Sequence, residues 1–191
     1  MSKNLYIISG CNGAGKTTAS YTVLPEILEC KEFVNADEIA RGLSPFNPES
    51  MAIEAGRLML QRIDDLLGKD ITFAIETTLA TKSYINLVRR AQAKGYRVSI
   101  VFFWLNSPEL AMKRVTERVQ HGGHNIPKEV IERRYKAGIH NLFHIFMPEV
   151  DYWTIYDNSE YPRKQIACGG INANTSIFVE SIFYKLQEYV K

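Results

Sequence analysis

Residues 10 to 17 combine three glycines, a lysine and a threonine in an order that suits phosphate binding. They read GCNGAGKT, which matches the pattern G-x-x-x-x-G-K-[ST] in full. The backbone N–H groups of such a loop bind phosphate oxygens, and the following helix adds partial positive charge at its N-terminus. Lys16 would reach the β- and γ-phosphates, and the Thr17 hydroxyl would bind Mg²⁺. The pattern predicts a site for ATP and Mg²⁺ formed by Gly10, Cys11, Asn12, Gly13, Ala14, Gly15, Lys16, Thr17 and Thr18.

An acidic residue, Asp37, follows the second short apolar segment of the chain. A helix over residues 16–24 leads roughly 14 Å away from the phosphate loop at 1.5 Å per residue. Residues 31–36, if extended, return by up to about 20 Å, which brings Asp37 back to the ligand-binding edge of the sheet. A carboxylate there would take the proton from a hydroxyl that attacks the γ-phosphate. The alternative is that Asp37 caps the N-terminus of a helix, and the local sequence favours neither role.

A second acid, Glu76, stands at the end of the apolar segment 71–75 and is followed by Thr77 and Thr78. An acid at the carboxyl end of a buried strand suits Mg²⁺ binding, either directly or through water. It would serve equally well to bind a substrate hydroxyl. The plain alternative is an edge carboxylate followed by threonines in a turn.

The segment 113–136 is rich in basic residues and has two glycines in its middle. Two basic helices joined by a glycine hinge are typical of a lid that closes over phosphates and excludes water. Arg118 and one of Arg133 or Arg134 would neutralise charge on the transferred phosphoryl group, and His124 would contact phosphate or substrate. The alternative is two solvated helix faces with local ion pairs.

Alternating strands and helices are needed to bring these residues to one edge of a sheet. Apolar periodicity and turn residues predict five strands over residues 5–9, 33–35, 71–75, 98–105 and 152–156, and helices over residues 16–24, 48–67, 84–94, 108–120, 128–144 and 178–190. This alternation predicts an α/β P-loop kinase fold with a mainly parallel sheet of five or six strands flanked by helices. The 191 residues form one domain in this interpretation, with a helical lid at about 113–136.

Composition narrows the classes of function. The net charge of +2 gives no general case for nucleic-acid or membrane binding, so a small-molecule partner is favoured. Three scattered cysteines, without a CxxC pair, fit a reducing compartment. The N-terminus does not resemble a signal peptide, and no apolar stretch reaches the roughly 18 residues of a membrane span. We therefore expect a cytoplasmic protein.

Three further strings make the chain resemble the zeta toxin family of P-loop kinases between about residues 5 and 156. They are VNADEIA, AIETTLA and RVTERV-x-HGGHNIPKEVIERRY. The aspartate of VNADEIA lies 21 residues after the lysine of the phosphate loop. The resemblance implies that Asp37 is the base that activates a sugar hydroxyl, that Glu76 and Thr78 bind the sugar, and that Arg118 is the first lid arginine. The second lid contact would be His124, or else Arg133 or Arg134.

The resemblance also implies a substrate and a partner. Well-known members of the family phosphorylate UDP-N-acetylglucosamine, and a small antitoxin covers the ATP site. The sequence therefore predicts an ATP- and Mg²⁺-dependent kinase that acts on a hydroxyl of a nucleotide sugar or a similar metabolite. The alternative, from another class, is a nucleotide-dependent switch or ATPase module without a phosphoryl acceptor.

Overall fold

The computed structural model describes residues 3–120 and 125–190 of the chain. Within these residues, seven strands form one sheet in the order β2-β3-β1-β4-β5-β6-β7. The strands β2, β3, β1, β4 and β5 are parallel to one another, whereas β6 and β7 are antiparallel. Their bounds are β1 (Lys3–Gly10), β2 (Glu32–Val34), β3 (Phe73–Thr77), β4 (Tyr96–Trp104), β5 (Tyr152–Asp157), β6 (Lys164–Gly170) and β7 (Ala173–Ile177).

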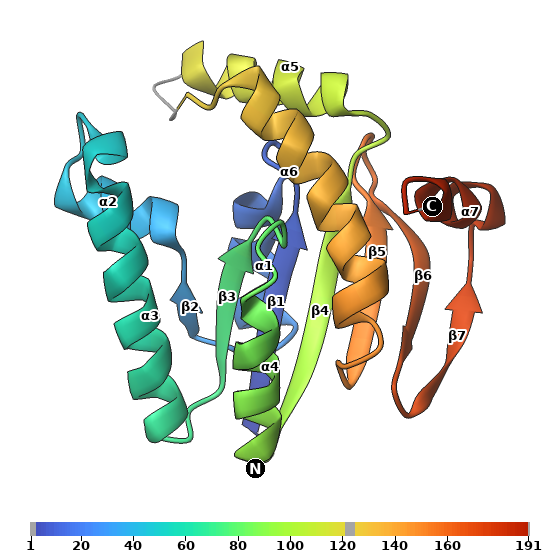
Figure 1. Ribbon diagram of the computed structural model, residues 1–191, viewed down its shortest axis with the longest axis horizontal. Helices are drawn as coiled ribbons and strands as arrows, with labels where there is room; N and C mark the ends of the chain where they lie inside the picture. The colour runs from blue at the N-terminus through green and yellow to red at the C-terminus, as the bar shows by residue number, and fades with distance from the viewer. Residues whose placement is uncertain (1–2, 121–124, 191) are drawn as a thin grey trace.

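Helices cover the sheet and cross its carboxyl edge (Figure 1). In that view α3, α4 and α6 lie in front of the sheet, α1 lies behind it, and α5 crosses above the strand ends. The bounds are α1 (Lys16–Glu26), α2 (Ala36–Leu43), the 3₁₀ turn η1 (Pro48–Met51), α3 (Ala52–Gly68), α4 (Tyr84–Ala93), α5 (Pro108–Gln120), α6 (Lys128–Asn141), the π-helical turn η2 (Leu142–Phe146) and α7 (Glu180–Glu188). The α/β class and the mainly parallel sheet are confirmed.

The apolar strands explain where the core lies. β4 carries the sequence YRVSIVFFW, is central in the sheet, and is buried except at Arg97 and partly at Val101. Such strands are buried on both faces in α/β folds and so read as nearly continuous apolar runs. The register aligns Ile8 with Glu76 on one side and Gly10 with Phe103 on the other. This alignment brings the phosphate loop after β1 beside the end of β3.

The sheet contains two strands that were not among the five predicted from the sequence. β6 ends in Gly169 and Gly170, and β7 is a polar, exposed edge strand with the sequence ANTSI. Neither has the apolar alternation that marks a half-buried strand. Both pair antiparallel beyond β5, where the pairing partner rather than the local sequence fixes the conformation.

Three helix predictions need correction. The interval after β2 forms the amphipathic helix α2, which was not among the predicted helices. The helix predicted over 16–24 continues to Glu26 as α1, with Pro25 inside it. The predicted helix over 128–144 ends at Asn141, and a π-helical turn follows it.

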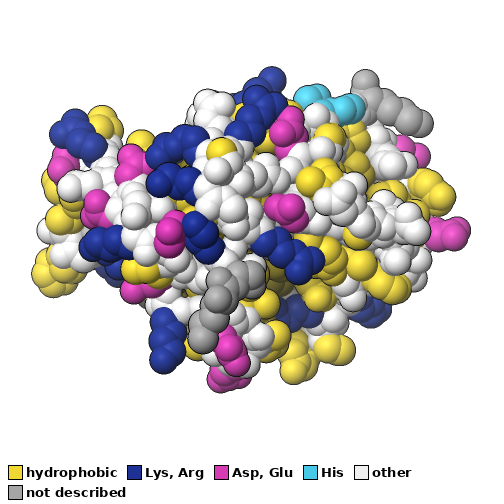
Figure 2. Space-filling model, turned by 90° about the horizontal axis from the view of Figure 1, so that it is seen from below, with side chains coloured by type: hydrophobic (Ala, Val, Ile, Leu, Met, Phe, Trp, Pro, Cys, Tyr) yellow, Lys and Arg dark blue, Asp and Glu magenta, His cyan; other side chains and the backbone are white. Residues whose placement is uncertain are grey.

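Surface charge is mixed. Figure 2 shows lysine and arginine side chains interspersed with acidic ones on the face seen from below, in keeping with the net charge of +2. None of the helices in the described ranges is both long and apolar enough to cross a membrane.

Candidate active site

The phosphate loop connects β1 to α1 in a shape that depends on its glycines, as Gly10 and Gly15 illustrate. Gly10 has a φ of 139°, and a Cβ on it would lie 2.1 Å from the carbonyl oxygen of Phe103. Gly15 has a φ of 79°, and its Cβ would lie 2.7 Å from Nδ2 of Asn158. Side chains at these positions would be strained and would collide, so the loop requires glycine there. Cys11 is buried inside the loop, and this burial raises the pKa of its thiol to about 11.

A carboxylate from β3 joins the side chains of this loop. Glu76 accepts a hydrogen bond on Oε2 from the Thr17 hydroxyl at 2.8 Å. Its Oε1 lies 3.6 Å from Nζ of Lys16, and the two side chains are only 9% and 7% exposed. Lys16 also donates to the carbonyl oxygen of Cys11 at 3.0 Å. The cluster therefore holds the lysine predicted to bind phosphate, the hydroxyl predicted to bind Mg²⁺ and an acid of the kind that assists Mg²⁺ binding.

Asp37 is the second residue of α2 and is not its cap. The cap is Asn35, whose Oδ1 accepts from the backbone N–H of Asp37 at 2.9 Å. The alternative that Asp37 caps the helix is therefore excluded, because Asn35, two positions before it, fulfils that role. The carboxylate of Asp37 is exposed and makes no hydrogen bond or ion pair with the described part of the chain. It is available for a ligand.

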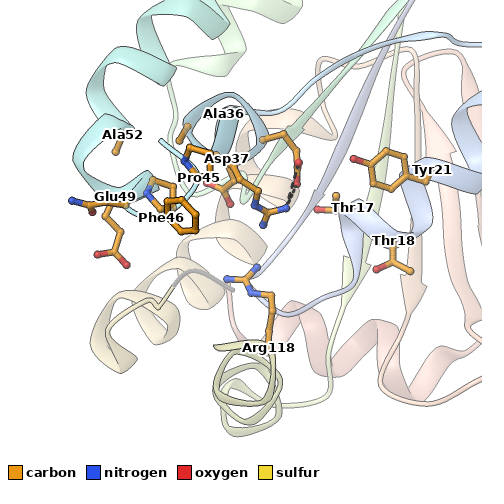
Figure 3. A pocket seen from close by; sticks show the side chains of 15 residues that line it. Thr17, Thr18, Tyr21, Ala36, Asp37, Pro45, Phe46, Glu49, Ala52 and Arg118 are labelled. Atoms are coloured by element: carbon orange, nitrogen blue, oxygen red, sulfur yellow. Dashed lines mark hydrogen bonds and ion pairs between the residues drawn. The ribbon is translucent and has the colours of Figure 1, made fainter. Parts of the chain in front are cut away.

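A cleft of about 680 Å³ opens beside the phosphate loop, between the N-terminal turns of α1 and α2 (Figure 3). In Figure 3, Arg118 projects from α5 toward the gap between Asp37 and Thr17. The cleft is lined by Thr17, Thr18, Tyr21, Ala36, Asp37, Glu38, Ala40, Arg41, Pro45, Phe46, Asn47, Pro48, Glu49, Ala52 and Arg118. It therefore brings together four of the residues to which the sequence assigned roles, namely Thr17, Thr18, Asp37 and Arg118.

Two residues predicted to bind substrate do not line this cleft. Glu76 faces Lys16 and Thr17, and Thr78 lies in the turn after β3. The carbonyl oxygen of Thr78 approaches Gly138 of α6 so closely that a Cβ on that glycine would lie 2.6 Å from it. The structure thus favours the metal role for Glu76 among the two that the sequence allowed.

Both basic helices approach the phosphate loop. A Cβ on Gly13 would lie 2.8 Å from the carbonyl oxygen of Ala111 in α5, and one side chain of α6 is hydrogen-bonded to the loop. Arg134 donates from Nη1 to Oδ1 of Asn12 at 3.3 Å, whereas Arg133 is exposed. His124, the other candidate, lies outside the described residues, as does the centre of the predicted lid. Arg134 is therefore the candidate for a second phosphate contact that the geometry favours.

The sequence did not predict the hydrogen bonds that support the phosphate loop from the turn after β5. Asn158, after β5, donates from Nδ2 to the carbonyl oxygen of Ala14 at 2.8 Å. Arg114 in turn donates to the carbonyl oxygens of Asn158 and Ser159, both at 2.8 Å. The polar turn directly after an apolar strand was the available signal, but nothing in the sequence showed which loop it would meet.

Comparisons with known proteins agree with this geometry. A family model described as zeta toxin matches residues 1–161. An uncharacterized protein of Haemophilus influenzae (strain ATCC 51907 / DSM 11121 / KW20 / Rd) is 29% identical over 126 residues, which cover 66% of this chain and 88% of that protein.

Solved structures with low sequence identity share the fold. The chain is similar to one in the AvrRxo1-ORF1:-ORF2 complex with ATP, with a TM-score of 0.77 and 16% identity. The match covers 97% of the present chain. It spans only 63% of that larger chain. A structure from the PezAT toxin–antitoxin system of Streptococcus pneumoniae has a TM-score of 0.68 and 15% identity. The match covers 99% of this chain and 86% of the chain in that structure. A gluconokinase from Sinorhizobium meliloti matches 83% of each chain, with a TM-score of 0.52 and 13% identity.

The matched interval of the family model includes the phosphate loop, Asp37, Glu76 and both basic helices. It covers well over half of the 191 residues. The chain therefore belongs to the zeta toxin family of P-loop kinases.

Proposed function

We propose that this protein transfers the γ-phosphate of ATP to a hydroxyl group of a nucleotide sugar, with UDP-N-acetylglucosamine as the first acceptor to test. The observation that carries the proposal is the cleft in which Asp37, Thr17 and Arg118 converge beside the phosphate loop. A free carboxylate opposite a phosphate-binding loop is suited to orient a hydroxyl and accept its proton. The similar chain crystallised with ATP supports the choice of phosphoryl donor.

The buried end of the site suits a magnesium–phosphate complex. The Thr17 hydroxyl and the Glu76 carboxylate are adjacent oxygen donors, which Mg²⁺ prefers. Mg²⁺, when bound, would neutralise phosphate charge. Lys16 would bind phosphate oxygens, and the backbone N–H groups of the loop would hold them in place. Because these groups are fixed before the substrate binds, most of their effect on rate would come from positioning and electrostatics.

The open end of the cleft suits an acceptor with a planar base and negative charge. Phe46 is fully exposed on one wall, and Tyr21, 64% exposed, lies on another. Aromatic faces of this kind stack on nucleobases. Arg41 and Arg118 line the same space and would offset the charge of a diphosphate, although Arg41 also pairs with Glu38. These features support a nucleotide-linked acceptor over a small neutral polyol.

The direct test is to incubate the protein with γ-labelled ATP, Mg²⁺ and a panel of UDP-sugars, nucleosides and short RNAs. We expect label on a UDP-sugar hydroxyl. Asp37→Asn should retain ATP binding and lose transfer, whereas the matched control Asp65→Asn, an exposed acid on α3 outside the cleft, should behave as the parent protein. ATP hydrolysis without any labelled acceptor would instead support a nucleotide-dependent switch.

A protein partner is the second part of the proposal. The similar PezAT structure comes from a toxin–antitoxin system, and the AvrRxo1-ORF1 chain was crystallised with AvrRxo1-ORF2. By analogy, we expect a small protein to bind this chain and block nucleotide access. Loss of ATP binding when such a partner is added to the purified chain would test this part.

A further inference from the structure

The amide side chain of Asn35 joins the two ends of the candidate active site. Its Oδ1 accepts from the backbone N–H of Asp37 at 2.9 Å, and its Nδ2 donates to Oε2 of Glu76 at 3.0 Å. Asn35 is 6% exposed and lies between β2 and α2, 41 residues before Glu76 in the sequence. One side chain thus contacts both the helix that carries the candidate base and the acid that faces Thr17 and Lys16.

An ordinary helix cap does not explain both contacts. A cap needs only an oxygen that accepts from the first turn, and Ser, Thr or Asp supply it about as well as Asn. The second contact requires a donor, because the carboxylate of Glu76 only accepts. Aspartate at position 35 would place a second carboxylate against Glu76, and serine has one polar atom instead of two. Asparagine is the short side chain that offers an acceptor to one partner and a donor to the other.

The two partners also fix which way the amide points. The reversed orientation would turn its oxygen toward the carboxylate of Glu76 and its NH₂ group toward the N–H of Asp37. Both contacts would be repulsive, so the hydrogen-bond network specifies one orientation. Since Glu76 also accepts from Thr17, the bond from Asn35 holds the carboxylate in the position from which it meets the phosphate loop.

We propose that Asn35 is a positioning residue for phosphoryl transfer, which holds Glu76 at the metal–phosphate end of the site and the first turn of α2 at the acceptor end. This inference rests on the proposed kinase function. Its consequence is that the two contacts act on different steps. The bond to Glu76 supports binding of Mg²⁺·ATP, and the cap under Asp37 supports the transfer step.

Two substitutions separate these contacts. Asn35→Ser keeps a capping oxygen and removes the donor to Glu76, whereas Asn35→Ala removes both. We expect Asn35→Ser to weaken Mg²⁺·ATP binding about 10- to 100-fold, the usual effect of losing a partner of a metal-binding group. Asn35→Ala should weaken binding to the same degree and lower kcat by a further factor of about five to ten, because a cap also contributes. Asn86→Ser, on the exposed side of α4, is the matched control.

Calorimetry of Mg²⁺·ATP binding tests the first contact without any acceptor. In a double-mutant cycle with Glu76→Ala, Asn35→Ser should have little further effect once Glu76 is absent. Equal losses in both backgrounds would overturn the proposal, as would parent-like binding by Asn35→Ser.

Amide hydrogen exchange on the ligand-free protein tests the second contact. The Asp37 amide should exchange faster in Asn35→Ala than in the parent, and Asn35→Ser should remain close to the parent. Unchanged exchange in Asn35→Ala would refute the cap contact. These results are independent of the acceptor, so a parent protein that labels no acceptor would count against the proposed function alone.

Discussion

The Lys16–Glu76 pair should be worth several times more to stability than an exposed ion pair of the same type, and Glu76→Gln measures this difference. The two charged atoms are 3.6 Å apart, and the side chains are 7% and 9% exposed. At an effective dielectric constant of about 20, two unit charges at this distance attract by about 4–5 kcal/mol. Glutamine removes that attraction and leaves the lysine charge buried without its partner, a change that typically costs about 3–5 kcal/mol.

The net loss should lie at the lower end of this range. The desolvation cost of the carboxylate also disappears, and the glutamine oxygen still accepts from Thr17 or Asn35. We expect Glu76→Gln to lower the free energy of unfolding by about 3 kcal/mol, or the melting temperature by about 6–12 °C for a domain of this size. The control is Glu32→Gln, which breaks the exposed pair with Arg62 and should cost less than about 1 kcal/mol.

Nucleotide supplies a second arm of the same test. Urea unfolding of both variants is measured with and without saturating ATP, in the presence of EDTA. Phosphate oxygens would give Lys16 new partners, so ATP should stabilise Glu76→Gln more than it stabilises the parent protein. The electrostatic reasoning fails if Glu76→Gln unfolds within 0.5 kcal/mol of Glu32→Gln, or if ATP stabilises the variant and the parent equally.

Four further predictions concern the site and the rest of the fold. Arg118→Ala should lower kcat about 10²- to 10³-fold, because the cation that projects toward the gap between Asp37 and Thr17 is lost. Steady-state kinetics beside ATP titrations would check this. Gly138→Ala should cost about 1–3 kcal/mol, because the new Cβ would lie 2.6 Å from the carbonyl oxygen of Thr78, whereas Gly56→Ala, with open space around it, should not lower the melting temperature. Burial raises the pKa of Cys11 and of Cys30, so a thiol reagent at pH 8 should label the half-buried Cys168 first. The unfolded thiol of Cys11 titrates near 9.0 and the folded one near 11, so its contribution to stability is complete below pH 9 and is lost as the pH rises to about 11, as unfolding curves across this range would show.

The sequence predicted the strand, loop and helix around the candidate phosphate site well because that segment is local. Eight consecutive residues, a preceding apolar strand and a following helix specify the loop without help from the rest of the chain. The return of Asp37 to the same edge also followed from lengths alone, since chain reach is fixed by backbone geometry. Both inferences use distances along the chain and need no side-chain detail.

The sequence could not specify which side chains would be hydrogen-bonded to each other across the site. Nothing around Glu76 showed whether its carboxylate would meet Thr17 or a substrate, because the answer depends on the register that aligns it with Ile8. Asn35 was passed over for the same reason, since one of its two partners is 41 residues away. β6 and β7 were missed because their conformation is imposed by pairing at the sheet edge.

The two ends of the site differ in how firmly the fold holds them, and this difference bears on substrate choice. At the phosphate end, Lys16 and Asn35 are buried and share Glu76 as a common partner. At the acceptor end, Phe46 is fully exposed in the loop between α2 and η1, and the wall it forms rests on few buried contacts. Replacing a buried, multiply bonded group disturbs its neighbours, whereas an exposed loop side chain is exchanged at little cost to stability. Substitutions in residues 45–49 should therefore change which hydroxyl compound is phosphorylated while ATP binding is retained, and substitutions around Glu76 should weaken the reaction with every acceptor alike.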